Sequence, residues 1–384
     1  MQFEFATAGR ILFGRGRIAE LPDLVSEMGS RVFVVTGRQS PHYDSVVESL
    51  RAKALHVTRF FNDREPTTDL VLTAVQMARA EQSDVVVGIG GGSIIDLGKA
   101  VSAMLTNPGE ILDYLEVVGK GQKLQHPTAP YIAVPTTAGT GAEVTRNAVL
   151  GSPQHRVKVS MRSPWLLPDI ALVDPEMTFG LPPEVTVNSG LDALTQLIEA
   201  YVSNQANPLT DGICLEGIKL AARSLPRVYQ NGQDPLARED MSIAATFSGL
   251  ALANAKLGAV HGFAGPLGGL YHAPHGGICA RLLPLVMEAN VEFIGKYFPD
   301  SPAMARFDRV AQILTEKNTV TARDGVTWIN KLCETLPILP LSDYGMLKSD
   351  IPQIVEQAKK ASSMKGNPVL LPENVLQDIL ERAL

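Results

Sequence analysis

The sequence is poor in the features that mark secreted and membrane-spanning proteins. It holds three cysteines, Cys214, Cys279 and Cys333, which are odd in number, far apart and without a CxxC pair. This usage argues against a disulfide framework or a zinc knuckle and favours a reducing compartment. No window approaches the roughly 20 apolar residues that a membrane helix needs. We therefore expect a cytoplasmic protein that is not embedded in a membrane.

The charge pattern and the N-terminal segment narrow the class further. The net charge is −6, and the 34 Lys and Arg residues are scattered and form no basic stripe, which argues against nucleic acid as a partner. The opening MQFEFATAGRILFG mixes charge and aromatics, so it predicts the first strands and not a signal peptide. A chain of 384 residues is long enough for two domains. A small-molecule enzyme is the default expectation.

The first half alternates short β-branched runs with stretches whose apolar residues recur at helical spacing. Such βαβα order predicts a largely parallel sheet with helices on both faces. Residues 107–130 are rich in Pro and Gly and indicate an excursion before the next strand. The expected strands are 31–37, 54–60, 84–90, 131–137 and 170–175, and the expected helices are 41–53, 67–82 and 93–106.

The character of the chain changes after Asp174. A break rich in Pro and Gly is followed by apolar and charged residues at helical spacing, which predicts an all-α second half. We place the domain boundary close to Gly180, with an α/β domain over residues 1–180 and a helical domain over residues 181–384. The last stretch, 372–384, predicts an amphipathic helix that packs on the rest.

A glycine-rich segment, Gly88–Asp96, follows an expected strand directly and opens a helix. Glycine backbone can approach a ligand closely, and free N–H groups at a helix start favour an anion. The segment therefore predicts a phosphate cradle, with an ordinary tight turn as the alternative. It differs from the usual dinucleotide fingerprint, because Ser93 stands where a third glycine is expected and because the loop follows the third strand, not the first. The expected cofactor-binding residues here are Gly90, Gly91, Gly92, Ser93 and Asp96.

A second loop, Pro135–Glu143, also follows a strand. The hydroxyls of Thr136, Thr137 and Thr140 are suited to contact a diphosphate or a nicotinamide amide. A polar turn with a helix N-cap is the alternative. Two such loops at the carboxyl ends of strands favour binding, since ligands of open α/β sheets lie at that edge.

The second half carries a candidate metal site. Asp192 and Gln196 are four residues apart on an expected helix and so share a face. His261 and His275 lie far downstream. One carboxylate and two imidazoles suit a divalent transition metal and leave positions open for substrate. Each residue taken alone is more typical of a structural role, so the hypothesis depends on the set.

In order and spacing, these segments resemble the iron-containing, group III alcohol dehydrogenases. The likeness runs from about residue 3 to about residue 380. It implies a dinucleotide-binding domain followed by a helical metal domain, with the active site in the cleft between them. The segments that carry it are GGGSIID with Lys99, PTTAGTGAEVT, LPDIALVDPEMTFGLPP, GLDALTQLIEAYVS and GAVHGFAGPLGGLYHAPHG.

The resemblance also implies a ligand set: an aspartate, a histidine one turn later and two further histidines. Asp192, His261 and His275 match three of these positions, whereas Gln196 replaces the fourth. Gly265 stands where many alcohol-oxidising members carry a histidine near the metal. Related glycerol dehydrogenases manage with three protein ligands. The two departures therefore bear on the identity and affinity of the metal, and on any histidine-dependent proton relay, but not on the nucleotide loops.

The activity so implied is that of an alcohol dehydrogenase or aldehyde reductase, which transfers hydride between NAD or NADP and a small alcohol or aldehyde. Asp192, His261 and His275 would act in catalysis by holding Zn or Fe as a Lewis acid. Gln196 would be a weak amide ligand or a partner of a bound water. By resemblance Lys158 reaches the cofactor, with a surface lysine as the alternative. Two residues, Phe247 and Asn254, fall where the family lines its substrate cleft or else pack within a helix.

The end of the strand expected at 31–37 bears on the choice between NAD and NADP. Many NAD-using dehydrogenases place a carboxylate there, which binds the ribose 2′-OH. Here Gly37, Arg38, Gln39 and Ser40 follow, and none is acidic. Gly37 leaves room for a 2′-phosphate that Arg38 and Ser40 would bind, so we expect NADP to be accepted. The alternative is that Arg38 is a solvated loop charge.

Three other functions compete with this one. A maleylacetate reductase would need a cationic pocket, but Lys256 and Arg281 are the only basic residues near the histidines. The same shortage disfavours a dehydroquinate synthase, which uses NAD only transiently. A degenerate protein that binds nucleotide without metal chemistry is the non-enzyme alternative. We also expect a homodimer or higher homo-oligomer, because N-terminal strands of the family often pair between subunits and residues 3–13 are suited to do so.

Overall fold

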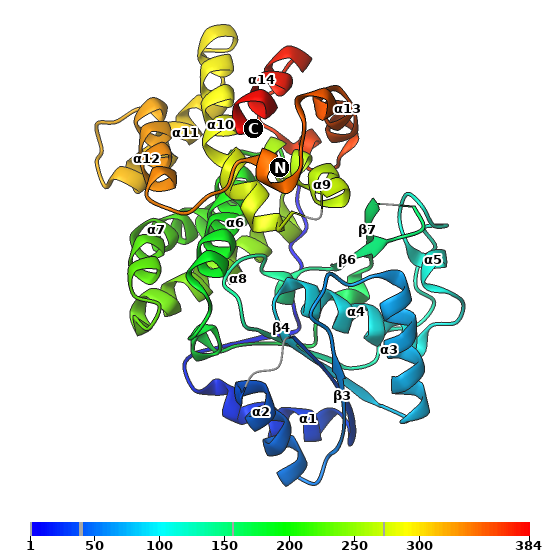
Figure 1. Cartoon of the computed structure of the whole chain (residues 1–384). Coiled ribbons are helices and arrows are strands. Elements are labelled where there is room, and N and C mark those ends of the chain that lie inside the picture. Colours follow the sequence, from blue (N-terminus) through cyan, green and yellow to red (C-terminus); the bar gives the residue numbers. More distant parts are fainter. Residues whose placement is uncertain (1, 38–40, 156, 272) are drawn as a thin grey trace. The chain divides into compact units, whose positions relative to one another are not determined.

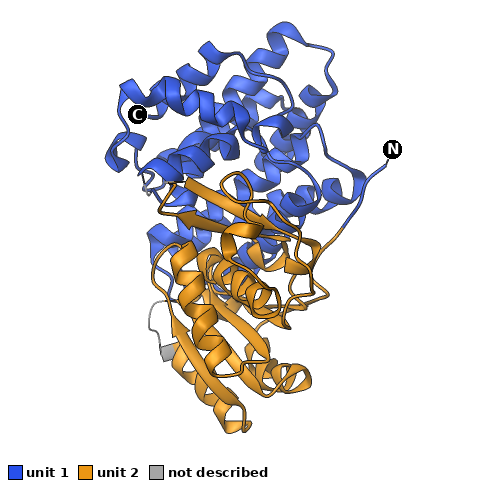
Figure 2. Cartoon of the chain, turned by 90° about the vertical axis from the view of Figure 1, so that its right-hand side faces the viewer, with its two compact units in different colours: residues 1–5, 138–140, 180–384 blue, residues 6–137, 141–179 orange. Residues whose placement is uncertain are grey.

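The structure is a computed structural model that describes residues 2–37, 41–155, 157–271 and 273–384 (Figure 1). The chain forms two compact units (Figure 2). Unit 2 comprises residues 6–137 and 141–179, and unit 1 comprises residues 1–5, 138–140 and 180–384. Each unit has hydrophobic clusters of its own and is described by itself.

Unit 2 is built on a six-stranded sheet whose pairings are all parallel, in the order β1-β8-β5-β4-β2-β3. Three inner strands, β8, β5 and β4, are buried at every residue, as expected of a sheet covered on both faces. The predicted parallel sheet is confirmed. Its strands are β1 (Arg10–Phe13), β2 (Arg31–Thr36), β3 (His56–Phe61), β4 (Val85–Gly90), β5 (Tyr131–Pro135) and β8 (Ile170–Val173).

Helices cover both faces because successive strand residues point to opposite sides. Val32 and Val34 of β2 pack in one cluster with α1 (Leu21–Met28) and α2 (Pro41–Ala52). Phe33 and Val35 pack in another with α3 (Thr68–Ala80) and α4 (Gly92–Thr106). The helices predicted at 41–53, 67–82 and 93–106 are therefore present.

Three local predictions differ from the structure. The strand expected from residue 54 begins at His56, because Ala54 adopts a left-handed backbone with φ of 64°. The glycine loop follows the fourth strand in chain order, since β1 precedes the strands counted from sequence. A separate antiparallel pair, β6 (Asn147–Ser152) and β7 (Val157–Arg162), was not predicted. The excursion at 107–130 contains the short helix α5 (Ile111–Tyr114).

In its described part, unit 1 consists of helices and loops, which confirms the predicted all-α second half. Several helices start with proline in the first turn and an Asn, Asp or Ser side chain that accepts backbone N–H groups, a combination typical of stable helix starts. The helices are α6 (Pro183–Val202), α7 (Pro208–Gln230), α8 (Pro235–Asn254), α9 (Ala259–Tyr271), α10 (His275–Tyr297), α11 (Pro302–Thr315), α12 (Ala322–Glu334), α13 (Ile351–Lys360) and α14 (Glu373–Ala383).

Helix α6 is central to unit 1, because most of its residues are buried all around the helix. It packs with α7, α8 and α10–α12 in one hydrophobic cluster, while α9, α10, α13 and α14 share a second. Among the described residues no single helix is long and apolar enough to cross a membrane. Helices α8 and α9 together have the length and composition of a membrane-spanning segment, but the pair is bent by 95° at its break.

Candidate metal centre and nucleotide loop

The glycine loop lies between β4 and α4, as the sequence predicted. A Cβ atom on Gly90 would lie 2.5 Å from Cγ1 of Ile94, so this glycine is needed for close packing of the helix start on the strand. Gly91 is the N-cap of α4 and brings no side chain that would cap it. A Cβ atom there would lie 3.3 Å from Cγ2 of Thr137. The first amides of α4 are therefore open to an anion, which the helix dipole also favours.

The structure brings other predicted nucleotide residues to the same edge of the sheet. Thr136 Oγ1 lies 3.1 Å from the hydroxyl of Tyr43, and a Cβ atom on Gly37 would lie 3.7 Å from that hydroxyl. Gly37 and Thr136 thus follow β2 and β5, which flank β4 on either side. Arg38 and Ser40 lie outside the described residues, and Thr140 belongs to unit 1.

Asp96 contacts the protein itself. Its Oδ2 accepts a hydrogen bond from the Val149 backbone at 3.0 Å, and its Oδ1 lies 3.8 Å from Lys99 Nζ. Lys99 in turn donates to Thr145 Oγ1 at 2.8 Å and to the Asn147 carbonyl at 2.9 Å. These contacts tie α4 to the start of β6, which gives Asp96 a structural role that the sequence did not indicate.

Burial shifts the pKa values of both Asp96 and Lys99. It raises the pKa of Asp96 to about 6, although the Lys99 charge and the Val149 amide oppose the rise. It lowers the pKa of Lys99 to about 8, against the attraction of Asp96 and Glu143. Lys158 lies elsewhere, on β7, where Nζ is 3.4 Å from Glu65 Oε1 and the side chain is 18% exposed. It is neither a free surface lysine nor fully buried.

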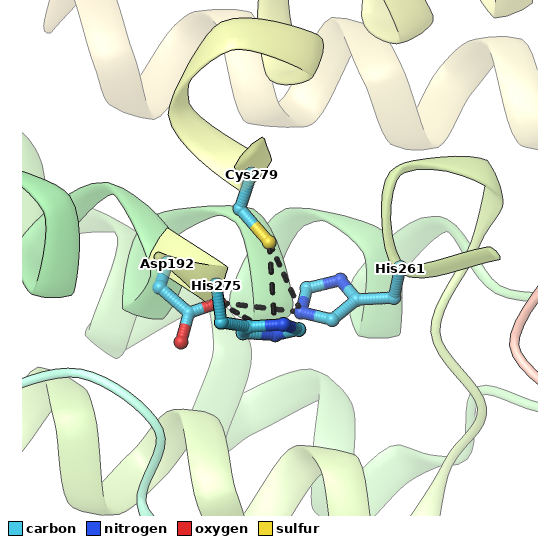
Figure 3. Close-up of side chains that lie close together, drawn as sticks. All are labelled: Asp192, His261, His275 and Cys279. Atoms are coloured by element: carbon cyan, nitrogen blue, oxygen red, sulfur yellow. Dashed lines mark hydrogen bonds and ion pairs between the residues drawn. The ribbon is translucent and has the colours of Figure 1, made fainter. Parts of the chain in front are cut away.

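In unit 1 three of the predicted metal ligands converge, together with a cysteine (Figure 3). Asp192 comes from α6, His261 from α9, and His275 and Cys279 from α10. Their donor atoms all lie within 4.8 Å of one another. Asp192 Oδ1 is 3.3 Å from His261 Nε2 and 3.7 Å from His275 Nε2. Three helices separated in sequence thus assemble one compact set of nitrogen, oxygen and sulfur donors.

The cluster is buried except on one side. The Asp192 side chain is 1% exposed and that of His261 is 7% exposed, whereas that of His275 is 40% exposed. A second carboxylate, Glu199, supports His261, since its Oε2 lies 2.7 Å from His261 Nδ1. Its Oε1 also accepts the Val260 amide at 2.7 Å. Two buried carboxylates around one imidazole require positive charge nearby, as a metal ion or protonated histidines would supply.

The pKa values of the clustered residues reflect the need for positive charge. Burial by itself lowers the pKa of His275, but the negative charges of Cys279 and Asp192 outweigh it and raise that pKa to about 9. Burial would also raise the pKa of Asp192, yet the neighbouring imidazoles bring it below its usual range. A divalent cation at the centre would take the place of the imidazole protons.

Gln196 lies one turn beyond Asp192 on α6 and is 2% exposed. Its Oε1 is buried without a hydrogen-bond partner among the described residues. Such an oxygen is costly to bury, so its position suits a cation or a bound water. A Cβ atom on Gly265 of α9 would meet no atom of the described residues within 4 Å. The residues present therefore fit a divalent metal, with one weak donor in place of the family's histidine.

The remaining candidates have internal partners. Phe247 packs against the α6–α8 cluster, and Asn254 Nδ2 donates to the Leu250 carbonyl at 2.8 Å. Arg281 donates to the carbonyls of Arg382 and Ala383 near the C-terminus, both at 2.9 Å. Arg281 thus anchors α14, and it is not a free cation for a dicarboxylate substrate.

Sequence reasoning missed Cys279 and Glu199. The cysteines form no CxxC pair, but Cys279 lies four residues after His275 on one helix and so shares its face. Glu199 lies seven residues after Asp192 on α6, which is also the same face. Helical spacing from the known candidates was the signal for both.

A parallel sheet with a glycine loop at its carboxyl edge, and a helical unit with a carboxylate and imidazole cluster, together define a nucleotide-using, metal-dependent oxidoreductase. The family model described as iron-containing alcohol dehydrogenase matches residues 8–175. The model for the C-terminal part of the Fe-containing alcohol dehydrogenase family matches residues 186–384. The chain belongs to the iron-containing alcohol dehydrogenase family.

Individual relatives agree with this assignment. Alcohol dehydrogenase 4 of Schizosaccharomyces pombe is 34% identical over 97% of this chain and 87% of its own length. Lactaldehyde reductase of Escherichia coli is 33% identical over 96% of this chain and 95% of its own. The crystal structure of a 1,3-propanediol oxidoreductase superposes with a TM-score of 0.92 at 31% identity, covering 100% of both chains. The chain is a metal-dependent alcohol dehydrogenase or aldehyde reductase.

Proposed function

We propose that the chain reduces small aldehydes and oxidises the corresponding alcohols, with a divalent metal held by Asp192, His261 and His275. The observation that carries this proposal is the convergence of these three side chains on one point of unit 1, within 4.8 Å. When bound, the ion supplies Lewis acidity toward the alcohol or carbonyl oxygen, which favours hydride transfer to or from the nicotinamide. An aldehyde panel with NADH and NADPH, run after loading with Zn²⁺ or Fe²⁺, tests it.

The residues around the metal centre and the glycine loop each have a defined part in this proposal. Glu199 orients His261 through the 2.7 Å contact at Nδ1, so that Nε2 faces the site. The partly exposed His275 lies on the side from which a substrate would enter. The first amides of α4, after Gly91, would bind the cofactor diphosphate. Thr137 lies against Gly91, and the Thr136 amide donates to the Gly90 carbonyl at 3.0 Å. Thr140 is assigned to the nicotinamide side from sequence.

With the Gln196 amide as the fourth donor, the proposed metal is Zn²⁺ in preference to Fe²⁺, and it is loosely held. The Gln196 amide oxygen is neutral and a weaker donor than imidazole nitrogen. For a given ligand set Fe²⁺ binds more weakly than Zn²⁺, so a weakened site loses iron first. We therefore expect preparations that are partly empty and that gain activity when metal is added.

The proposed cofactor preference includes NADP. Its support is the absence of an acid after β2, where Gly37, Arg38, Gln39 and Ser40 follow the strand. A carboxylate there would repel the 2′-phosphate. The ratio of kcat/KM for NADPH and NADH, measured in the wild type and in Arg38→Ala, decides this point. A strong preference for NADH that is unchanged in Arg38→Ala would contradict it.

A homo-oligomer is proposed as well, because β1 lies at one edge of the sheet with a single strand neighbour, β8. Such an edge offers backbone groups to a second chain. Sedimentation of the loaded protein would show a monomer if this proposal is wrong.

A further inference from the structure

We propose that the Cys279 thiolate is a fourth protein ligand of the metal, which makes the centre an Asp192–His261–His275–Cys279 site that selects zinc. The inference rests on the proposed function, since it shares the other three ligands. It adds a sulfur donor that the sequence did not indicate and that strengthens the proposed preference for zinc.

The distances match a tetrahedron around one ion. Zinc bonds of about 2.3 Å to sulfur and about 2.0–2.1 Å to nitrogen or oxygen place sulfur and nitrogen about 3.6 Å apart, and nitrogen and oxygen about 3.3 Å apart. Cys279 Sγ lies 3.7 Å from His261 Nε2 and 3.8 Å from His275 Nε2. Asp192 Oδ1 lies 3.3 and 3.7 Å from the same two nitrogens. Four of the six separations among these atoms are therefore close to those between zinc ligands, and all six lie within 4.8 Å.

The position of the sulfur suits a cation at the centre. Without an ion, Cys279 Sγ would donate its proton to one imidazole nitrogen and accept from the other, because it is nearly equidistant from both. Figure 3 shows the sulfur directed toward both imidazole rings. A cation at the centre satisfies all four atoms at once, and the thiol proton leaves to solvent when the ion binds.

Helix α10 fixes the sulfur in this position. His275 is the first residue of the helix and Cys279 lies one turn later, so both side chains emerge from the same face. Cys279 is fully buried and cannot turn to solvent. Cys333 differs, because its Sγ donates to the backbone carbonyl of Ala280 at 4.0 Å and is not one of the clustered donor atoms, so it makes a matched control.

A sulfur ligand changes the chemistry of the site. Two anionic ligands, Asp192 and the Cys279 thiolate, balance the charge of a divalent ion. Soft thiolate favours zinc and disfavours Mg²⁺, Mn²⁺ and Ca²⁺, which prefer oxygen. Gln196 would then hold a bound water and would not bind the ion. A substrate oxygen would be a fifth ligand, and catalytic zinc sites are known to expand from four to five ligands.

The experiment uses the full chain, stripped by chelation and reloaded with Zn²⁺ or Co²⁺. X-ray absorption at the zinc edge should show one sulfur at about 2.3 Å, and the cobalt form should show near-ultraviolet thiolate-to-cobalt charge transfer. Both signals should persist in Cys333→Ser and vanish in Cys279→Ser. The zinc affinity of Cys279→Ser should fall by at least about 10–100-fold, the loss seen when even an outer partner of a ligand is removed.

The outcomes separate this inference from the proposed function. A zinc-loaded wild type with nitrogen and oxygen ligands only would overturn the sulfur ligand and leave the three-residue metal centre standing. A sulfur signal that survives in Cys279→Ser would overturn it too. Failure to bind zinc stoichiometrically would overturn both. If Cys279→Ser does not fold, the wild-type absorption spectrum still decides, because it needs no variant.

Discussion

Glu199 and His261 form a carboxylate–imidazole pair in which Oε2 lies 2.7 Å from Nδ1, while the opposite ring nitrogen lies 3.3 Å from Asp192 Oδ1. When Nδ1–H donates to Glu199, the lone pair of Nε2 points at the cluster. Partners of this kind set the tautomer and orientation of a ligating histidine and raise its basicity. The pair therefore links a residue that touches no substrate to the strength of the metal site.

The first prediction tests that link with Glu199→Gln. An amide keeps the shape of the side chain but removes its charge, so zinc affinity should fall by about 10–100-fold. Competition with a chromophoric chelator measures it. Glu216→Gln, at an exposed position of α7, is the matched control and should bind zinc like the wild type. Equal zinc affinity in Glu199→Gln would show that the pair only stabilises the fold.

The second prediction concerns Gln196→His. An imidazole one turn after Asp192 would replace an unpartnered amide oxygen, so zinc affinity should rise by roughly tenfold, or about 1.4 kcal/mol. Calorimetric titration of the chelated protein measures the change. Gln205→His, an exposed glutamine just beyond the same helix, controls for an added histidine. No gain at position 196 would mean that this side chain does not face the ion.

The third prediction concerns the glycine loop. Gly91→Val places a branched side chain against Thr137, only 3.3 Å from the first added carbon, and it blocks the amides of α4. Binding of NADH or NADPH, followed by cofactor fluorescence, should weaken much more than urea stability does. Gly212→Val, where an added carbon meets no atom within 4 Å, should leave cofactor binding intact. Wild-type affinity in a folded Gly91→Val protein would show that the loop is only a turn.

The fourth prediction is a pH dependence. The pKa of Asp96 rises from 3.8 to about 6 in the folded protein, chiefly through burial. The folded state therefore holds this proton more tightly than the unfolded chain, so the stabilisation is complete below 3.8 and is lost as pH rises through about 6. Over that window the wild type should lose on the order of 3 kcal/mol relative to Asp96→Asn.

Urea unfolding of both proteins at several pH values measures this difference, and the exposed Asp63→Asn variant controls for lost charge. Asparagine retains an oxygen for the Val149 amide, so the comparison isolates ionisation. If the stability of the wild type relative to Asp96→Asn stays constant, or increases, as pH rises, the result would contradict the buried pair described for Asp96 and Lys99.

Sequence patterns predicted the sheet because short β-branched runs alternate with stretches of helical spacing, which is a local property. The run on β2 is apolar throughout because Val34 and Val35 pack in opposite clusters. The pair β6–β7 was missed although β7, VKVSMR, alternates apolar and polar residues in the way typical of a strand with one buried face. Its partner β6 packs against α4. Asp192, His261 and His275 were found as a set because the resemblance supplied their partners.

What sequence could not supply was the meeting of side chains from three helices. The distance between Cys279 and His261, 18 residues apart, is fixed by how α9 packs on α10, and no spacing rule gives it. The same holds for Glu199 and His261, which are 62 residues apart. For Gly265 the reverse applies: the sequence showed the missing histidine, and a Cβ atom at its position would meet no atom of the described residues within 4 Å.

The central claim is that the Asp192–His261–His275 centre holds a metal on which aldehyde reduction depends. The most direct measurement follows NAD(P)H oxidation with a small aldehyde before chelation, after exhaustive chelation, and after Zn²⁺ is restored. We predict that turnover falls to background without metal and returns with zinc. Undiminished turnover in protein shown to be free of metal would contradict the account.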